Sequence, residues 1–159
     1  MALNHLPPAS RIWMFGADRI LSSDEMSTLH TSLQNFVNGW QAHGKDLSAG
    51  YEIEHSCMVV IAVDENAEAP SGCSIDKAFR LLEEFGATHQ IAFFNRTNIY
   101  LKRENQVKIF SKTEAKDALG RGDISESDEI LQTLHTNLKG YSESPYVRIS
   151  ESWLAKLPV

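Results

Sequence analysis

The feature that most constrains the fold is an apolar run at residues 57–63, Cys-Met-Val-Val-Ile-Ala-Val. A short run this apolar and rich in β-branched residues is typical of a central strand buried on both sides. The segment just before it, residues 51–54, alternates apolar or aromatic residues with glutamates, as a strand with one wet face does. Because His55 and Ser56 separate the two segments, we predict two adjacent strands joined by a turn.

Helical patterns lie on both sides of this strand pair. Ser22 and Glu25 have the spacing of a capping box, in which each side chain bonds the other residue's backbone N–H. The helix that they open has its apolar residues at helical spacing, namely Met26, Leu29, Leu33, Phe36, Val37 and Trp40. A second helix is expected to begin near Ser74 and to end at Gly86. Short strands are expected at residues 11–15 and 91–94.

The resulting order of elements is strand, helix, strand, strand, helix, strand. This order predicts an α+β fold with a ferredoxin-like βαββαβ core, an antiparallel sheet with both helices on one face. In that arrangement the first helix ends, and the second begins, at the same edge. We therefore expect residues 40–44 and residues 71–74 to be neighbours in space.

The remainder of the chain is expected to extend this core. Residues 98–102 and 106–110 resemble a β-hairpin, and residues 113–119 a short helix. Ser125 and Asp128 predict the cap of a third long helix, whose inward residues are Ile130, Leu131, Leu134 and Leu138. The tail, residues 140–159, is expected to pack as an ordered arm, because its three large aromatic residues are costly to leave in water. We predict one domain over residues 1–159, with a core at about 10–110 and a helical extension and aromatic arm at about 111–159.

Composition restricts the partners and the location that we expect. The chain carries 21 acidic against 15 basic residues, a net charge of −6, which argues against binding to a nucleic acid backbone. The cluster Lys102, Arg103 and Lys108 is accordingly expected to be a solvated face. No apolar run reaches the length of about 18–20 residues that a membrane span needs. The two cysteines form no disulfide framework, so we expect a reduced, cytoplasmic protein without a membrane span.

The candidate site is the stretch Ser71-Gly72-Cys73-Ser74-Ile75-Asp76. Free N–H groups and the helix dipole at a helix start stabilise a thiolate, so Cys73 is a candidate nucleophile, with His43 across the corner as its base. Alternatively, Cys73 packs as a small apolar residue. His43 is then a cation that stabilises the end of the first helix.

The same helix start is also a candidate for binding ligands without catalysis. Ser71, Gly72 and Ser74 form the kind of N-terminus that binds anions, although ordinary capping explains these residues too. Trp40 could line a ligand groove or belong to the core. Asp64, beside Glu65 at the end of the apolar strand, could serve as an acid or base or bind a cation, or could be a solvated loop charge. The scattered histidines lack the spacing of metal ligands, so no metal and no cofactor are predicted.

Several of these motifs resemble those of a family of small, uncharacterised bacterial proteins. The resemblance rests on Ser10-Arg11-Ile12-Trp13, Trp40-Gln41-Ala42-His43-Gly44, Tyr51-Glu52-Ile53, Val63-Asp64-Glu65 and the Ser71–Asp76 stretch. Members are often labelled "ABC transporter ATPase". An ATPase of that class needs a glycine-rich loop ending in Gly-Lys-Ser or Gly-Lys-Thr. The only Gly-Lys pair here is followed by Asp46, so we predict that ATPase activity is absent.

Three hypotheses about function remain open at the level of sequence. The leading one is a non-catalytic module that binds a small ligand or a protein through the edge formed by Trp40, His43 and Cys73. The second is a small thiol-dependent enzyme with Cys73 as nucleophile. The third is a structural protein that assembles into homo-oligomers through a sheet edge or the aromatic tail and has no ligand site.

Overall fold

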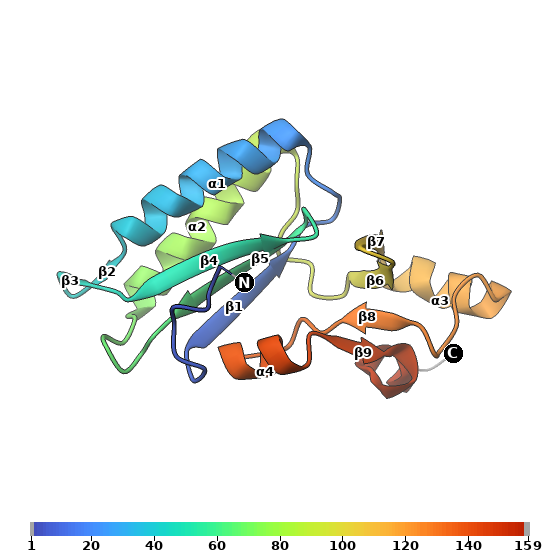
Figure 1. Cartoon of the computed structure of the whole chain (residues 1–159). Helices are drawn as coiled ribbons and strands as arrows, with labels where there is room; N and C mark the ends of the chain where they lie inside the picture. Colours follow the sequence, from blue (N-terminus) through green and yellow to red (C-terminus); the bar gives the residue numbers. More distant parts are fainter. Residues whose placement is uncertain (1, 158–159) are drawn as a thin grey trace.

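The computed structural model describes residues 2–157 as a mixed α+β protein with antiparallel sheets (Figure 1). The first sheet has the order β1-β5-β4, and the second has the order β7-β6-β8-β9. The strands are β1 Arg11–Gly16, β2 Gln41–Ala42, β3 Lys45–Asp46, β4 Ala49–Glu54, β5 Met58–Val63, β6 Ile99–Arg103, β7 Gln106–Phe110, β8 Glu129–Leu131 and β9 Tyr146–Arg148. The helices are α1 Ser23–Asn38, α2 Gly72–His89, α3 Lys112–Arg121 and α4 Leu138–Glu143. The α+β class is therefore confirmed.

The apolar run forms the central strand of the first sheet. All of β5 is buried, and it pairs antiparallel with β1 on one side and β4 on the other. The turn between β4 and β5 has φ values of 54° at His55 and 55° at Ser56. Two consecutive left-handed residues match the right-handed twist of a tight hairpin. The prediction of two strands joined by this turn is thus confirmed.

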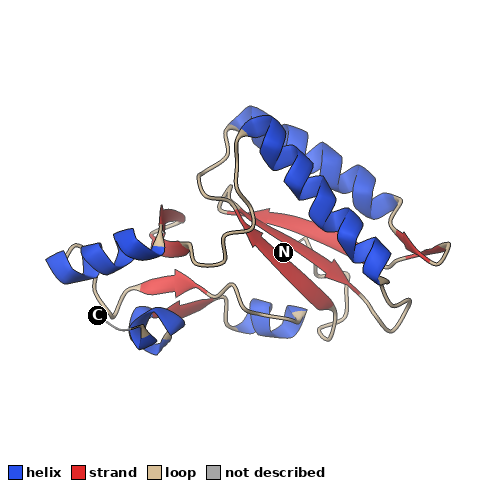
Figure 2. Cartoon of the chain, turned by 180° about the vertical axis from the view of Figure 1, so that it is seen from behind, coloured by secondary structure: helices blue, strands red, loops and turns tan. Residues whose placement is uncertain are grey.

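Helices α1 and α2 pack on the same face of the first sheet (Figure 2). The predicted capping box at Ser22 and Glu25 is present, and the core includes the fully buried side chains of Leu29, Leu33 and Leu82. Helix α2 continues to His89, beyond its predicted end at Gly86. A methyl group on Gly86 would collide with the carbonyl of Ile91, so this glycine allows close packing of the following loop and does not end the helix.

The predicted strand at residues 91–94 is not formed, and this prediction was wrong. The segment is a loop whose Ile91 and Phe93 are buried in the core cluster that includes residues of α2. The first sheet consequently has three strands, and the complete βαββαβ core is not present. At the outer edge of β1, the only pairing among residues 2–157 is the bridge between Arg11 and Asn137.

The predicted helix opened by Ser125 and Asp128 was also wrong. The backbone N–H of Ser125 donates to Asp128 Oδ2 over 2.8 Å, but this contact closes a turn that leads into β8. Ile130 and Leu131 are buried as strand residues, while Leu134 lies in a loop with 66% of its surface exposed. A side-chain bond across three residues stabilises a turn as well as a helix start, and pairing with β6 and β9 favours the strand here.

The tail packs as an ordered arm, as predicted, within the described residues. Tyr141 and Leu154 are buried, and Tyr146 and Trp153 are half-buried. A second apolar cluster joins this arm to β6, α3 and β8, and its members include Leu101, Ala115, Ile130, Ile149 and Leu154. Across residues 2–157, no helix is both long and apolar enough to cross a membrane.

Basic residues of the β6–β7 hairpin pair with neighbouring acids. Lys102 lies 3.8 Å from Glu129, and Arg103 lies 3.4 Å from Asp128. These two cations are therefore partly neutralised within the second sheet and the turn before β8.

Candidate functional site

The end of α1 and the start of α2 meet as the topology predicted, in a corner that we call the tryptophan corner (Trp40, Ser71–Ser74). Trp40 is buried, and its indole N–H donates to the carbonyl oxygen of Ser74 over 2.8 Å. Trp13 packs edge-on against the same indole, with ring centroids 6.3 Å apart. Trp40 is thus a core residue that joins two helices.

The two serines of the tryptophan corner bond each other. Ser71 is the N-cap of α2, and its hydroxyl accepts the N–H of Ser74 over 3.1 Å. The Ser74 hydroxyl accepts the N–H of Ser71 over 2.6 Å and donates to the Ser71 carbonyl over 2.8 Å. Gly72 is exposed, and a methyl group on it would meet no atom. Capping therefore occurs, but the N-cap is Ser71, and Ser74, near which the helix was expected to begin, is the third residue of α2.

The two residues expected to form a thiol–base pair are both exposed. Cys73 lies in the first turn of α2, and His43 lies at the tip of the β2–β3 hairpin with a φ of 52°. Within residues 2–157, no hydrogen bond connects them, and the Cys73 thiol bonds no other side chain. The other cysteine, Cys57, is fully buried, and that burial raises the pKa of its thiol to about 12.

Asp64 and Glu65 organise the loop that follows β5. Asp64 accepts the backbone N–H of Asn66 over 3.0 Å, and Glu65 lies 3.3 Å from the guanidinium of Arg11. In the described part of the chain, no three histidine, cysteine or acidic side chains gather closely enough to hold a metal ion.

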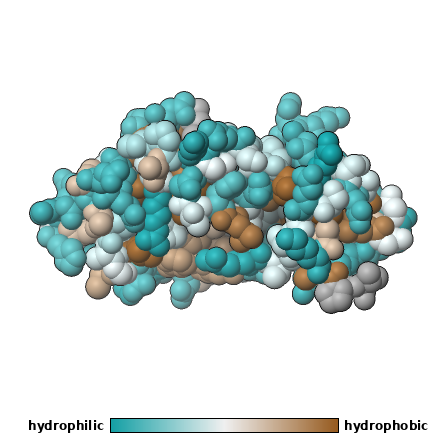
Figure 3. Space-filling view, turned by 90° about the horizontal axis from the view of Figure 1, so that it is seen from below, coloured by the Kyte–Doolittle hydropathy of each residue, from teal (hydrophilic) through white to brown (hydrophobic). Residues whose placement is uncertain are grey.

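A different region carries a cavity that we call the inter-sheet cavity, because it lies between the first sheet with α2 and the second sheet. Its volume is about 310 Å³. Figure 3 shows apolar residues at the surface where these two parts of the molecule meet. The lining residues come from β1, α2, the loop before β6, β6 itself and the loop after β8: Met14, Phe15, Gly16, Phe79, Glu83, Phe93, Phe94, Asn95, Arg96, Asn98, Tyr100, Thr133 and Leu134.

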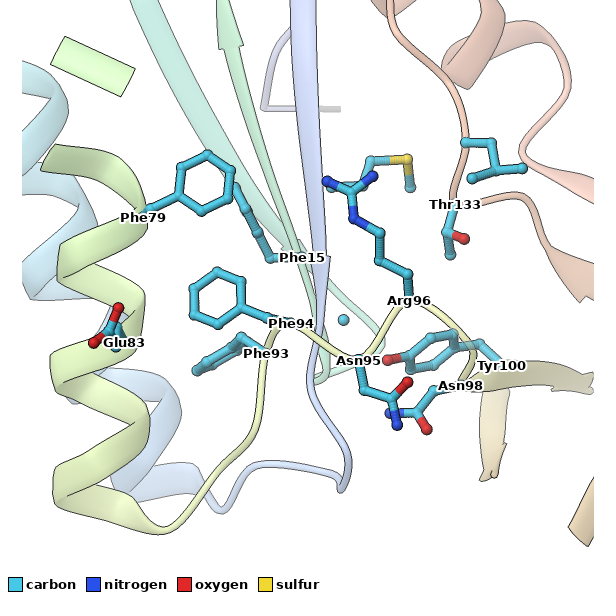
Figure 4. Close-up of a pocket in the computed structure, with 13 residues that line it drawn as sticks. Phe15, Phe79, Glu83, Phe93, Phe94, Asn95, Arg96, Asn98, Tyr100 and Thr133 are labelled. Carbon is cyan, nitrogen blue, oxygen red and sulfur yellow. The ribbon is translucent and has the colours of Figure 1, made fainter. Parts of the chain in front are cut away.

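One wall of the inter-sheet cavity is aromatic (Figure 4). Phe79 and Phe94 stack with centroids 5.7 Å apart and an interplanar angle of 16°. Phe15 meets both rings edge-on, at 5.1 Å and 5.9 Å. Phe94 keeps 41% of its surface exposed, so the stack presents an apolar face to whatever enters the cavity.

Asn98, beside Tyr100, also lines this cavity. The residue is only 7% exposed, and its Nδ2 is buried with no hydrogen-bond partner in the described part of the chain. Burial raises the pKa of the neighbouring Tyr100 phenol, and the Asn98 side chain beside it offsets part of that increase. The Tyr100 hydroxyl instead donates to the Ala17 carbonyl over 2.8 Å. An unpartnered buried amide costs about 1–3 kcal/mol.

Arg96 supplies a cation to the same cavity. Its side chain extends from the loop between Phe94 and Asn98 along the cavity (Figure 4), and it forms no ion pair or hydrogen bond among residues 2–157. The loop that holds it is fixed by Asn95, whose Oδ1 accepts the N–H and the hydroxyl of Thr97 over 3.0 and 2.7 Å. The carboxylate of Glu83 lies on α2, on the other side of the aromatic wall (Figure 4).

None of the seven residues predicted as a site lines the inter-sheet cavity, which sequence reasoning missed. The predicted set comprised Trp40, His43, Asp64, Ser71, Gly72, Cys73 and Ser74, of which the structure brings Trp40, Ser71 and Ser74 into direct contact. The available signal was the pair Phe93-Phe94 followed by the polar run Asn95-Arg96-Thr97-Asn98. Comparison with protein-family models, with curated proteins and with solved structures found no match for this chain.

Proposed function

We propose that this protein is a binding module for a small ligand with an apolar part and a polar, hydrogen-bond-accepting part, held in the inter-sheet cavity. The observation that carries the proposal is the pairing of an exposed aromatic wall with polar side chains that no group in the described protein satisfies. Ligand pockets commonly combine a mostly apolar lining with a few convergent polar groups. Phe79 and Phe94 would contact the apolar part, and Arg96 and Asn98 would donate to the polar part.

We also infer that the first sheet with α1 and α2 is a ferredoxin-like core that lacks its last strand. The antiparallel order β1-β5-β4, with both helices on one face, supports this inference. The missing strand would pair with the outer edge of β1. Met14, Phe15 and Gly16 of that strand line the inter-sheet cavity, so the cavity opens where the fold leaves this edge uncovered.

The tryptophan corner supports ligand binding less well. The hydroxyls of Ser71 and Ser74 and the indole N–H of Trp40 all bond groups of the protein itself. A ligand there would have to replace existing hydrogen bonds, whereas a ligand in the inter-sheet cavity would add new ones. The cavity is therefore the better candidate on energetic grounds.

Amide-resolved NMR titration with indole-3-acetate tests the proposal, since this probe carries both an aromatic ring and a carboxylate. We expect shift changes at the backbone amides of residues 94–100 and 133–134 and none at residues 71–74. Phe94→Ser should weaken binding about tenfold, because a lost aromatic contact of about 1.4 kcal/mol corresponds to that factor.

Ile20→Ser is the matched control for this variant. Ile20 is another exposed apolar residue, at 47% exposure, and it does not line the inter-sheet cavity. It should leave the affinity unchanged. Shifts centred on the tryptophan corner, or equal affinity of the Phe94→Ser variant and the parent protein, would contradict the proposed site.

A further inference from the structure

The outer edge of β1 leaves backbone groups unused beside the inter-sheet cavity. The N–H of Ile12 points outward, because it donates to the carbonyl of Thr136 over 3.0 Å. Backbone groups alternate in direction along a strand, so the N–H and C=O of Met14 and the N–H of Gly16 point outward too. In the described part of the chain, these groups of Met14 and Gly16 have no backbone partner, since pairing stops at the Arg11–Asn137 bridge.

We propose that the ligand of the inter-sheet cavity is a peptide-like carboxylate: an extended amide, an apolar side chain and a terminal carboxylate. This proposal rests on the proposed function of the cavity and names the ligand class. The amide pairs with the outward N–H and C=O of Met14, as an added strand would. The side chain lies on Phe79 and Phe94, and the carboxylate accepts hydrogen bonds from Arg96.

The charge of the site favours a carboxylate at the Arg96 end. The guanidinium is planar and offers a fork of N–H groups that matches the two carboxylate oxygens. Arg96 is exposed and forms no ion pair among residues 2–157, so its guanidinium is free to bind a carboxylate. Glu83 on the far side of the aromatic wall disfavours a second carboxylate in the ligand.

The size of the cavity limits the length of the ligand. Its volume of about 310 Å³ lies at the lower end of the range for small-molecule pockets. The free edge of β1 is also short, because residues 136–138 already pair with residues 10–12. Both facts favour a single acylated amino acid, whether free or as the C-terminal residue of a peptide.

Three related probes test the ligand class: N-acetyl-L-phenylalanine, its C-terminal amide and 3-phenylpropionate. The amide lacks the carboxylate, and 3-phenylpropionate lacks the acylated amine. We expect N-acetyl-L-phenylalanine to bind at least about tenfold more tightly than either, because each loses one set of hydrogen bonds. Acetyl-Ala-Ala-Phe is measured beside them to distinguish a free acylated amino acid from the C-terminus of a peptide. If the opening of the cavity accepts further residues, this peptide should bind at least as tightly as N-acetyl-L-phenylalanine. If the opening does not accept them, it should bind more weakly.

Two variants connect these differences to the proposed groups. In Arg96→Met, N-acetyl-L-phenylalanine should no longer bind more tightly than its C-terminal amide. In Arg80→Met, which removes an exposed arginine outside the cavity, the difference in affinity should remain. Met14→Pro removes the outward N–H without removing a bond to β5 and should abolish the advantage over 3-phenylpropionate. Met14→Ala is its control. If Met14→Pro does not fold, as judged by circular dichroism, the three probes and Arg96→Met decide the question.

The outcomes separate the ligand class from the binding function. Equal affinities for the three probes, with shifts at the cavity, would overturn the peptide-like class and leave the cavity as a binding site. Tighter binding of free phenylalanine would also overturn it, in favour of a zwitterion held by Arg96 and Glu83. Absence of shifts at residues 94–100 with every probe, indole-3-acetate included, would overturn the proposed function itself.

Discussion

The tryptophan corner and the inter-sheet cavity use polar side chains in opposite ways. At the corner, Trp40, Ser71 and Ser74 bond one another or the backbone, with distances between 2.6 and 3.2 Å. In the cavity, the Asn98 amide and the Arg96 guanidinium have no bonding partner among residues 2–157. The first region is built of residues that look functional in sequence, and the second of residues that do not.

This difference shows what distinguishes a structural polar cluster from a candidate site. A capped helix start offers hydroxyl and N–H groups, but the cap itself consumes them. A buried amide without a partner costs free energy in the folded protein, and a ligand that bonds it can offset this cost. The comparison therefore predicts that substitutions at the corner change stability, whereas substitutions in the cavity change binding.

The largest effect on stability is expected for Trp40→Ala. Loss of a buried indole leaves a void between α1, α2 and Trp13, and large-to-small changes of this kind cost about 3–5 kcal/mol. Chemical denaturation measures the change in the free energy of unfolding. Trp40→Phe, which keeps an aromatic ring but loses the bond to the Ser74 carbonyl, should cost about 1–2 kcal/mol.

The matching measurement on this variant is ligand affinity. At temperatures where Trp40→Phe remains folded, the affinity for indole-3-acetate should equal that of the parent protein. A large loss of affinity with little loss of stability would place the binding site at the tryptophan corner after all.

The pH dependence of stability provides a second contrast, between a satisfied and a desolvated carboxylate. Hydrogen bonds from Arg19, then from the Ser22 backbone, lower the pKa of Glu25 from 4.5 to about 2. Glu25 therefore adds stability above pH 4.5 that is lost as the pH falls towards 2. In Glu52, burial raises the pKa despite the hydrogen bond that Tyr141 donates over 2.9 Å.

The contributions of Glu25 and Glu52 to stability should consequently change in opposite directions as the pH changes. A group whose pKa is raised by folding favours the folded state below its unfolded pKa and loses that contribution as the pH rises through the folded value. Glu52→Gln should thus raise the melting temperature at pH 7, and the gain should vanish near pH 4. Glu25→Gln should lower the melting temperature at pH 7, and the variant should lose less stability than the parent protein as the pH falls from 4.5 towards 2. A destabilised Glu52→Gln protein at pH 7 would contradict this account of Glu52.

Smaller effects are expected at the start of α2. Ser71→Ala removes the N-cap hydroxyl and should cost about 1 kcal/mol of unfolding free energy. Gly72→Ala is the matched change one residue further on, where an added methyl group meets open space. It should leave stability unchanged or raise it by about 0.5–1 kcal/mol, because alanine loses less backbone freedom on folding. Loss of stability in Gly72→Ala would indicate a role for this glycine that capping does not explain.

Sequence patterns predicted the first sheet and its helices well because local signals and packing agree there. The apolar run at Met58–Val63 pairs with strands on both sides, and the capping box at Ser22 is followed by apolar residues at helical spacing that pack in the core. The topology then predicted correctly that Trp40 lies beside Ser74, residues 34 positions apart in the chain.

The errors occurred where one local pattern is compatible with two structures. Four apolar residues at 91–94 fit a strand or a buried loop equally well, and close packing at Gly86 selected the loop. The Ser125–Asp128 spacing fits a helix cap or a turn, and pairing with β6 and β9 selected the turn. The inter-sheet cavity had no local signature, because four separate segments of the chain assemble it and its decisive property, the unused donors, exists only after folding.

The smallest effect is expected for Cys73→Ser. The side chain is exposed and bonds no group in residues 2–157, so the free energy of unfolding should change by less than about 0.5 kcal/mol. In the folded protein a thiol reagent should label Cys73 and spare Cys57, which is fully buried and should react only in denaturant. The affinity for indole-3-acetate should also be unchanged by Cys73→Ser. Cys73 lies in the tryptophan corner and does not line the inter-sheet cavity. A loss of affinity in this variant would therefore indicate that the ligand binds at the tryptophan corner, which no change in stability could show.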